Sequence, residues 1–121
     1  MDQKIILKFF NYSSCTTCKK AIKWLRSKNI TFELIDIVSE PPTIAMLIEA
    51  SKVYGDRKYL LNTSGSSYRL LGARTVREMS DRDFFEALFD DPKLIKRPFL
   101  SFSNDSYLIG FKEDKWAEKL L

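Results

Sequence analysis

The feature that most constrains this chain is a pair of cysteines, Cys15 and Cys18, spaced as Cys-x-x-Cys. They follow an apolar run that predicts a strand, roughly residues 4–10, and precede a run with helical periodicity, about residues 16–27. Free N–H groups and the positive end of a helix dipole favour an anion, so the first cysteine would be stabilised as its reactive thiolate. The second, one turn further on, could resolve a mixed disulfide on the first. The pattern predicts a redox or nucleophilic site at a strand-to-helix turn.

Two other interpretations of the cysteine pair are open at this stage. A structural zinc site would need two more soft ligands, and the chain contains no histidine and no further cysteine. A pair of buried thiols would behave as two small hydrophobic residues. Capping and turn residues surround Cys15, namely Ser13, Ser14, Thr16 and Thr17. Cys18 instead shares an apolar helical stripe with Ala21, Ile22 and Leu25. We therefore expect an exposed, nucleophilic Cys15 and a more buried, resolving Cys18.

The length, composition and charge of the chain limit the other classes of protein to which it could belong. The 121 residues fit one domain, and 45% hydrophobic residues suffice for a core. No apolar run could span a bilayer, and the first residues lead straight into a strand without a secretory signal, so we expect a cytoplasmic protein. The net charge of +4 is modest, and no nucleic-acid motif is present. We predict no bound metal and no organic cofactor.

Basic residues nevertheless form two small clusters, which consist of Lys19, Lys20 and Lys23 and of Lys93, Lys96 and Arg97. An ordinary solvated helix face explains such a cluster without any function. Alternatively, the two clusters could form an anion-attracting mouth around Cys15.

The remaining elements follow the order βαβ, a helical block, then ββα. A second strand over residues 31–37 should be parallel to the first, because a helix of about twelve residues joins them. The helical block covers about residues 43–91. A third strand over 94–102 is entered through Pro98, and Asn104-Asp105 predicts a hairpin turn into a fourth strand over 106–111. The last helix is expected to point four residues inward, Trp116, Ala117, Leu120 and Leu121.

Three helices are predicted within the helical block. The first begins in the segment 39–43, with prolines in its first turn, and ends at Gly55. The second is short and ends at Leu71, before Gly72. The third runs from Ser80, a capping residue, to about residue 90. The inward stripes of the first and third helices are expected to be Ile44, Leu47, Ile48 and Ser51, and Phe84, Phe85, Leu88 and Phe89.

Four stretches taken together resemble a known family. They are residues 14–21 with the sequence SCTTCKKA, residues 61–72, residues 94–100 with the sequence LIKRPFL, and residues 109–114. In this order, and over nearly the whole chain, they resemble the arsenate reductase-related ArsC/Spx family. The resemblance implies an α/β, thioredoxin-like fold with a mixed four-stranded sheet. It further implies a single domain over residues 1–121, with the helical block as an insertion between the second and third strands.

The resemblance also implies residue roles that spacing alone cannot show. Cys15 matches the nucleophilic cysteine of the arsenate reductases. Arg69 and Arg97 match arginines that bind the oxyanion and stabilise the thiolate, a task that suits a planar, permanently charged guanidinium. Pro98 matches a proline that is typically cis and faces the cysteine loop. We place Ser14, beside the nucleophile, with these oxyanion- or substrate-binding residues.

Two functions follow from the resemblance. The first is a bacterial, cytoplasmic thiol-disulfide oxidoreductase that acts on an oxyanion, a disulfide or a glutathione adduct. Its reductant would be glutathione, glutaredoxin or thioredoxin, although the glutathione- and glutaredoxin-using arsenate reductases carry one cysteine in this loop and this chain carries two. The second is an Spx-like redox-sensing regulator that binds the C-terminal domain of the RNA polymerase α-subunit without contacting nucleic acid directly. The other arginines are expected to be solvated or salt-bridged, including Arg26, Arg57, Arg74 and Arg77.

Overall fold

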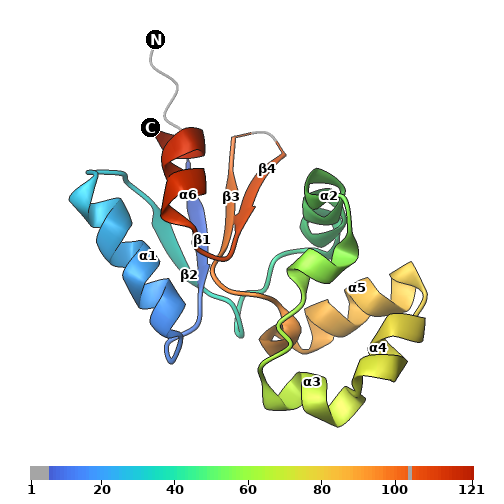
Figure 1. Ribbon diagram of the computed structural model, residues 1–121. Coiled ribbons are helices and arrows are strands. Elements are labelled where there is room, and N and C mark those ends of the chain that lie inside the picture. Colours follow the sequence, from blue (N-terminus) through green and yellow to red (C-terminus); the bar gives the residue numbers. More distant parts are fainter. Residues whose placement is uncertain (1–5, 104) are drawn as a thin grey trace.

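The computed structural model describes residues 6–103 and 105–121. Its centre is a four-stranded sheet with the strand order β2-β1-β3-β4. The strands are β1 Lys8–Asn11, β2 Glu33–Asp36, β3 Phe99–Phe102 and β4 Ser106–Ile109. β1 and β2 are parallel, whereas β3 is antiparallel to both β1 and β4 (Figure 1). The predicted mixed four-stranded sheet is confirmed.

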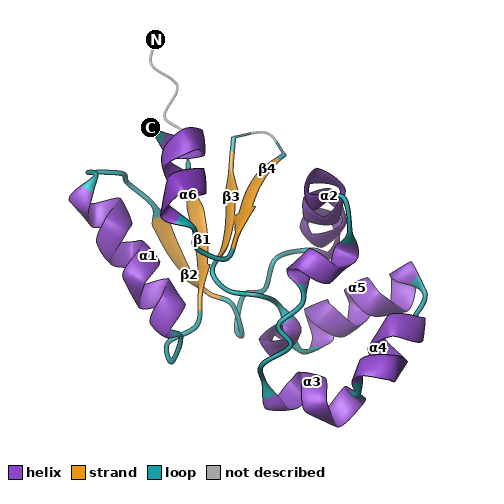
Figure 2. Ribbon diagram, viewed as in Figure 1, coloured by secondary structure: helices purple, strands orange, loops and turns teal. Residues whose placement is uncertain are grey.

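Helices pack on both faces of this sheet (Figure 2). α1 Thr16–Ser27 and α6 Glu113–Leu120 cover one face, where Phe9, Leu100 and Trp116 belong to one buried cluster. The other face packs against the helical segments between β2 and β3 through a second cluster that contains Phe10 and Phe99. The alternation of Phe9 and Phe10 therefore feeds two cores, as expected for a sheet buried on both sides.

The segment between β2 and β3 is helical, as predicted. It contains α2 Ile44–Tyr54, η1 Arg57–Leu60, α3 Ser66–Leu71, α4 Ala73–Glu78, α5 Asp81–Asp90 and η2 Pro92–Leu94. α4 was missed by the sequence prediction, because only Val76 of its six residues is buried and a single buried residue makes no periodic pattern. Gly72, with φ of 88°, both ends α3 and begins α4.

The structure corrects several predicted boundaries. α2 begins at Ile44 and is capped by Thr43, whose Oγ1 accepts a hydrogen bond from the Met46 N–H at 3.1 Å, so the two prolines precede the helix. The third strand begins at Phe99 and not at residue 94, since Asp91 caps the short helix η2 and turns the chain. β2 and β4 are likewise shorter than the predicted strands. The predicted start of the first strand, residues 4–5, and Asn104 of the predicted hairpin turn lie outside the described residues.

The prediction of an inward orientation is wrong for two residues. Phe89 is 39% exposed at the end of α5, and Leu121 is 69% exposed beyond α6. Each stands at the outer edge of its helical stripe, where the core has already ended. The other members of the predicted stripes of α2, α5 and α6 are buried or half-buried, and the buried ones are Leu47, Phe84, Phe85, Leu88 and Trp116.

Arg57 contributes more to the fold than a solvated arginine would. Its Nη2 donates to the carbonyl of Met79 at 2.8 Å, and its Nη1 forms an ion pair with Asp81 at 2.8 Å. The guanidinium also lies over the ring of Phe84, 4.5 Å from its centroid. Arg57 thus joins η1 to the end of α4 and the start of α5.

A tyrosine hydroxyl ties α2 to the outer strand β4. The Ile109 N–H donates to the Tyr54 hydroxyl at 2.7 Å, on the side of β4 that has no neighbouring strand. In Tyr54→Phe this buried N–H loses its acceptor, and we expect the free energy of unfolding to fall by about 1–2 kcal/mol. Urea unfolding should show this loss as a lower midpoint, with Tyr59→Phe, at an exposed position, as the control. An unchanged midpoint in Tyr54→Phe would contradict the assignment.

No helix in the described part of the chain is long and apolar enough to cross a membrane.

Candidate functional site

Cys15 lies at the N-terminus of α1 and acts as its capping residue. Its Sγ accepts a hydrogen bond from the Cys18 N–H at 3.2 Å. Its own N–H donates to the Tyr12 carbonyl at 3.0 Å, which closes the loop between β1 and α1 into a tight turn. The side chain is half-buried. This position leaves Cys15 accessible to a reagent and points a backbone donor at its sulfur.

Cys18 occupies the first inward position of α1 and is fully buried. Burial raises the pKa of its thiol to about 12, and the hydrogen bond with Cys15 adds to this effect. The positive charge of Arg97 acts in the opposite direction on the same pKa. Cys18 therefore remains a protonated thiol near neutral pH. The relative burial of the two cysteines is as the sequence predicted, and both are free thiols.

Arg97 is brought to the cysteine loop by the pairing of β1 with β3. In that pair Phe10 faces Phe99, so continuing the register by two residues places Tyr12 opposite Arg97. The guanidinium indeed lies over the Tyr12 ring, 4.4 Å from its centroid. Its Nη1 donates to the Lys93 carbonyl at 3.1 Å, whereas its Nε is buried and has no hydrogen-bond partner among the described residues. The hydrogen bonds of the guanidinium to the described residues use Nη1 alone, so Nη2 is left there as a donor for an anion.

Pro98 follows Arg97 through a cis peptide bond and is buried. The same register places it beside Asn11, the last residue of β1. The Asn11 Oδ1 is also buried without a hydrogen-bond partner in the described structure. Two unpaired polar atoms, one donor and one acceptor, therefore belong to neighbouring positions at the end of β1 and the start of β3.

The other two predicted site residues are less closely tied to this group. Ser14 is exposed and precedes Cys15 directly. Arg69 is exposed on α3, and its Nη1 donates to the Ser64 carbonyl at 3.1 Å. The described contacts bring together Cys15, Cys18 and Arg97, and none of them joins Arg69 to these three. The roles of all these residues remain predictions.

Sequence reasoning missed two neighbours of Arg97. One is Tyr12, which supplies both the ring beneath the guanidinium and the carbonyl that holds the Cys15 N–H. The other is Asn62, whose Nδ2 donates at 3.2 Å to the same Lys93 carbonyl that Arg97 uses. Tyr12 could have been noticed in the sequence as the aromatic residue of the cysteine turn. Its contact with Arg97 could only be found from the pairing of β1 with β3, which are distant in the sequence.

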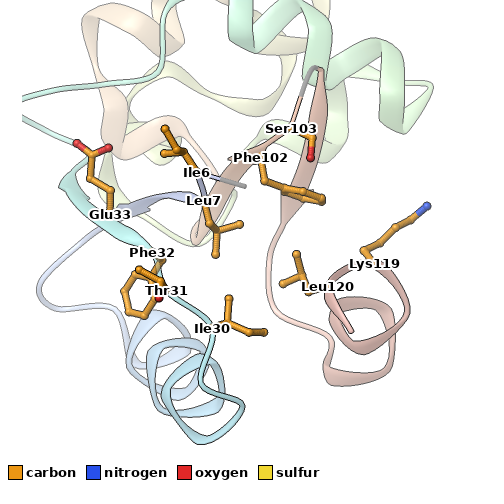
Figure 3. Close-up of a pocket in the computed structure, with 10 residues that line it drawn as sticks. All are labelled: Ile6, Leu7, Ile30, Thr31, Phe32, Glu33, Phe102, Ser103, Lys119 and Leu120. Carbon is orange, nitrogen blue, oxygen red and sulfur yellow. The ribbon is translucent and has the colours of Figure 1, made fainter. Parts of the chain in front are cut away.

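A separate pocket lies elsewhere in the molecule (Figure 3). Apolar side chains line it from the strand ends and α6, among them Leu7, Ile30, Phe32 and Leu120, while Glu33 and Lys119 lie at its margin. It includes neither cysteine and no arginine. The thiol chemistry therefore has to be sought at the cysteine loop. Within the described residues, no group of three or more histidine, cysteine or acidic side chains could hold a metal ion.

Comparisons with known proteins agree with this fold. The chain is 38% identical over 116 residues to the uncharacterized protein YusI of Bacillus subtilis, covering 93% of this chain and 96% of YusI. It is 28% identical over 107 residues to the global transcriptional regulator Spx of Staphylococcus aureus, covering 88% of this chain and 80% of Spx.

Solved structures of similar proteins share the fold of this chain. A crystal structure described as a possible arsenate reductase from Streptococcus mutans superimposes with a TM-score of 0.83 at 29% identity, covering 94% of this chain and 99% of the other. The structural neighbours confirm the α/β, thioredoxin-like fold of the arsenate reductase type. The model of the ArsC family matches residues 10–119, and the chain therefore belongs to the ArsC family.

Proposed function

We propose that this protein is an arsenate reductase-like thiol-disulfide oxidoreductase, with Cys15 as nucleophile and Cys18 as resolving cysteine. The observation that carries the proposal is the environment of Cys15. The sulfur is accessible, accepts the Cys18 N–H, and lies in a loop stacked against an arginine whose Nε has no acceptor among the described residues. A thiolate and an anion-binding group in one loop are what the reduction of a charged thiol adduct or oxyanion requires.

The proposed reaction on a disulfide runs in two exchanges. The Cys15 thiolate attacks one sulfur of the substrate, forming a mixed disulfide and releasing the other sulfur as a thiolate. Cys18 then loses its proton and attacks the Cys15 sulfur, which forms the Cys15–Cys18 disulfide and releases the second substrate thiolate. The substrate gains two electrons and the cysteine pair loses two. An external dithiol, or glutathione with glutaredoxin, would return the pair to its reduced form.

The same residues would serve an oxyanion such as arsenate. Cys15 would displace a hydroxyl group of arsenate as water and form a thiolate ester, with Arg97, Ser14 and Pro98 around the anion. Attack of Cys18 on the Cys15 sulfur would then transfer two electrons to arsenic and release arsenite. Arg69 binds the Ser64 carbonyl through Nη1, which leaves its Nη2 and Nε as donors for the anion. Such chemistry suits the reducing cytoplasm, where we place the protein.

Alkylation of Cys15 tests the proposal directly. The rate of iodoacetamide labelling would be measured against pH, with and without arsenate or sulfate, in a Cys18→Ser background that leaves one thiol. We expect a labelling midpoint below the ordinary thiol value of about 8.5, and slower labelling when the oxyanion is present. Arg97→Gln should abolish the protection. A normal midpoint with no protection in the parent protein would refute an activated thiolate in an anion site.

The burial of Cys18 predicts how the second exchange depends on pH. Because the Cys18 pKa is raised to about 12, mainly by burial, the attacking thiolate is scarce near neutral pH and becomes more abundant as pH rises. In the mixed disulfide the Cys15 sulfur carries no charge, so the part of the Cys18 pKa shift that Cys15 causes is lost. The larger part, which burial causes, remains. We expect the rate of intramolecular resolution to rise about tenfold per pH unit between about pH 7 and 9. Stopped-flow release of a chromogenic thiol measures it, and a flat profile would contradict the prediction.

A second function is supported by the similarity to Spx. We propose as the alternative that the Cys15–Cys18 pair is a redox sensor and that its disulfide changes the affinity of the protein for the α-subunit of RNA polymerase. The similarity covers 80% of Spx and 88% of this chain. A pull-down of purified α-subunit with reduced and oxidised protein tests this alternative. Identical recovery in the two states would remove the switch.

A further inference from the structure

A groove that takes no part in the proposed thiol chemistry lies beside the outer strand β4. It is bordered by the C-terminal end of α2, by η1 and by α6, with β4 as its floor. Figure 1 shows α6 and α2 on either side of β4. The space measures about 440 Å³, within the range of sites that hold small molecules or single side chains of a partner. Neither cysteine lines it, nor does Arg97.

The charged residues that line this groove have one sign. Four lysines line it, Lys96, Lys112, Lys115 and Lys119, and no carboxylate does. The acidic residues of α6, Glu113, Asp114 and Glu118, are all absent from the lining. None of the ion pairs in the described structure uses these lysines. The lining is therefore positive and favours an anionic partner, while the Glu49 carboxylate, outside the lining, accepts a hydrogen bond from the Tyr107 hydroxyl at 2.6 Å.

The surface between the lysines is apolar. Val53 and Tyr59 are exposed at one wall, by 55% and 46% of their areas. Tyr107 and Trp116 are buried and form part of the floor. Exposed apolar groups inside a ring of charges are typical of a binding surface, because they lose water when a partner covers them.

The spacing of the lysines indicates an extended occupant. Lys112 is the N-cap residue of α6 and Lys119 lies seven residues further on, which corresponds to about 10 Å along the helix axis. One phosphate or carboxylate group would reach only part of that row. Alternate residues of an extended peptide lie about 7 Å apart, so two or three acidic side chains could each meet a lysine. An apolar side chain between them would enter the space beside Val53 and Tyr59.

We propose that this groove binds an acidic segment of a protein partner, in which carboxylates flank an apolar side chain. A nucleic acid strand fits less well, because bases bind such surfaces by stacking on open aromatic faces. Trp116 and Tyr107 are buried, and the Lys58 ammonium lies over the Tyr59 ring, 5.4 Å from its centroid. The inference is independent of the proposed reaction, since its residues are not those that perform the exchange.

Fluorescence anisotropy tests this surface. The probe is a short labelled peptide in which glutamates flank two leucines, with a labelled oligothymidylate of similar length for comparison. The triple variant Lys112→Gln/Lys115→Gln/Lys119→Gln should raise the peptide Kd about tenfold, or about 1.4 kcal/mol. The matched triple variant Lys19→Gln/Lys20→Gln/Lys23→Gln removes the same charge from exposed positions of α1 and should change the Kd less than about twofold.

A second variant separates charge from shape. Tyr59→Ala leaves the net charge unchanged and should weaken peptide binding about threefold or more, while binding of a polyglutamate without leucine stays the same. Equal losses in the two triple variants would show only general attraction to a basic protein and would overturn the proposal. Tighter binding of oligothymidylate with the same variant pattern would assign the groove to nucleic acid instead. Absence of peptide binding at low salt would refute the site. Thiol labelling of Cys15 should be unaffected by Tyr59→Ala, so this outcome is distinct from failure of the proposed reaction.

Discussion

Replacing Cys15 with serine is expected to reduce disulfide turnover to the uncatalysed rate, a loss of about 10³-fold or more. A serine hydroxyl is not ionised near neutral pH and cannot form a mixed disulfide. Serine is nevertheless a good helix-capping residue, so it can accept the Cys18 N–H in place of the sulfur and α1 should be retained. Turnover with a chromogenic disulfide and an external dithiol measures the loss, and circular dichroism checks that the variant is folded.

The matched variant Cys18→Ser should behave differently. Its first exchange is intact, because Cys15 keeps its sulfur and its backbone donor, but without the external dithiol no second thiol can release the bound half of the substrate. We expect one equivalent of chromogenic thiol to be released rapidly, followed by an adduct on Cys15 that intact mass spectrometry detects. If Cys15→Ser loses no more turnover than Cys18→Ser, or if the adduct forms on Cys18 in the parent protein, the two roles are wrongly assigned.

The sequence was sufficient to predict the part of the site that is local. A strand, a Cys-x-x-Cys and a helical stripe within residues 8–27 predict α1, the place of Cys15 in the turn before it and the burial of Cys18, and all three are present. These features depend on hydrogen bonds and packing within about one helical turn. Capping residues and periodicity report such interactions directly.

The parts that were missed depend on contacts between distant residues. Nothing in the local sequence places Arg97 over Tyr12, because that contact results from the pairing of β1 with β3 across the whole helical block. For the same reason Arg57 looked like a surface residue, although it bonds backbone carbonyls about twenty residues away. The family resemblance predicted the fold and a site role for Arg97. It also suggested Arg69, which the structure leaves on the exposed side of α3.

The guanidinium of Arg97 leads to the second large prediction. Arg97→Gln removes the positive charge and the planar pair of donors beside the cysteine loop, and we expect kcat/KM for an oxyanion or glutathione-adduct substrate to fall about 10²–10³-fold. Arg97→Lys keeps the charge without the fork and should lose less. Arg26→Gln, an exposed position on α1 with the same change of charge, is the control and should lose less than about twofold. Equal losses in Arg97→Gln and Arg26→Gln would mean that only general electrostatic attraction is involved.

Tyr12 provides an independent check of how Arg97 is held. Its ring lies under the guanidinium, and such a contact contributes about 0.5–2 kcal/mol. Tyr12→Leu should therefore lower kcat/KM about two- to thirtyfold for a charged substrate, whereas Tyr12→Phe, which keeps the ring face, should retain most of it. In the Arg97→Gln background the Tyr12→Leu loss should largely disappear, because the ring then has no guanidinium to hold. Additive losses in the double variant would mean that Tyr12 does not act through Arg97. Tyr12 would then act through the cysteine turn, in which its carbonyl accepts a hydrogen bond from the Cys15 N–H.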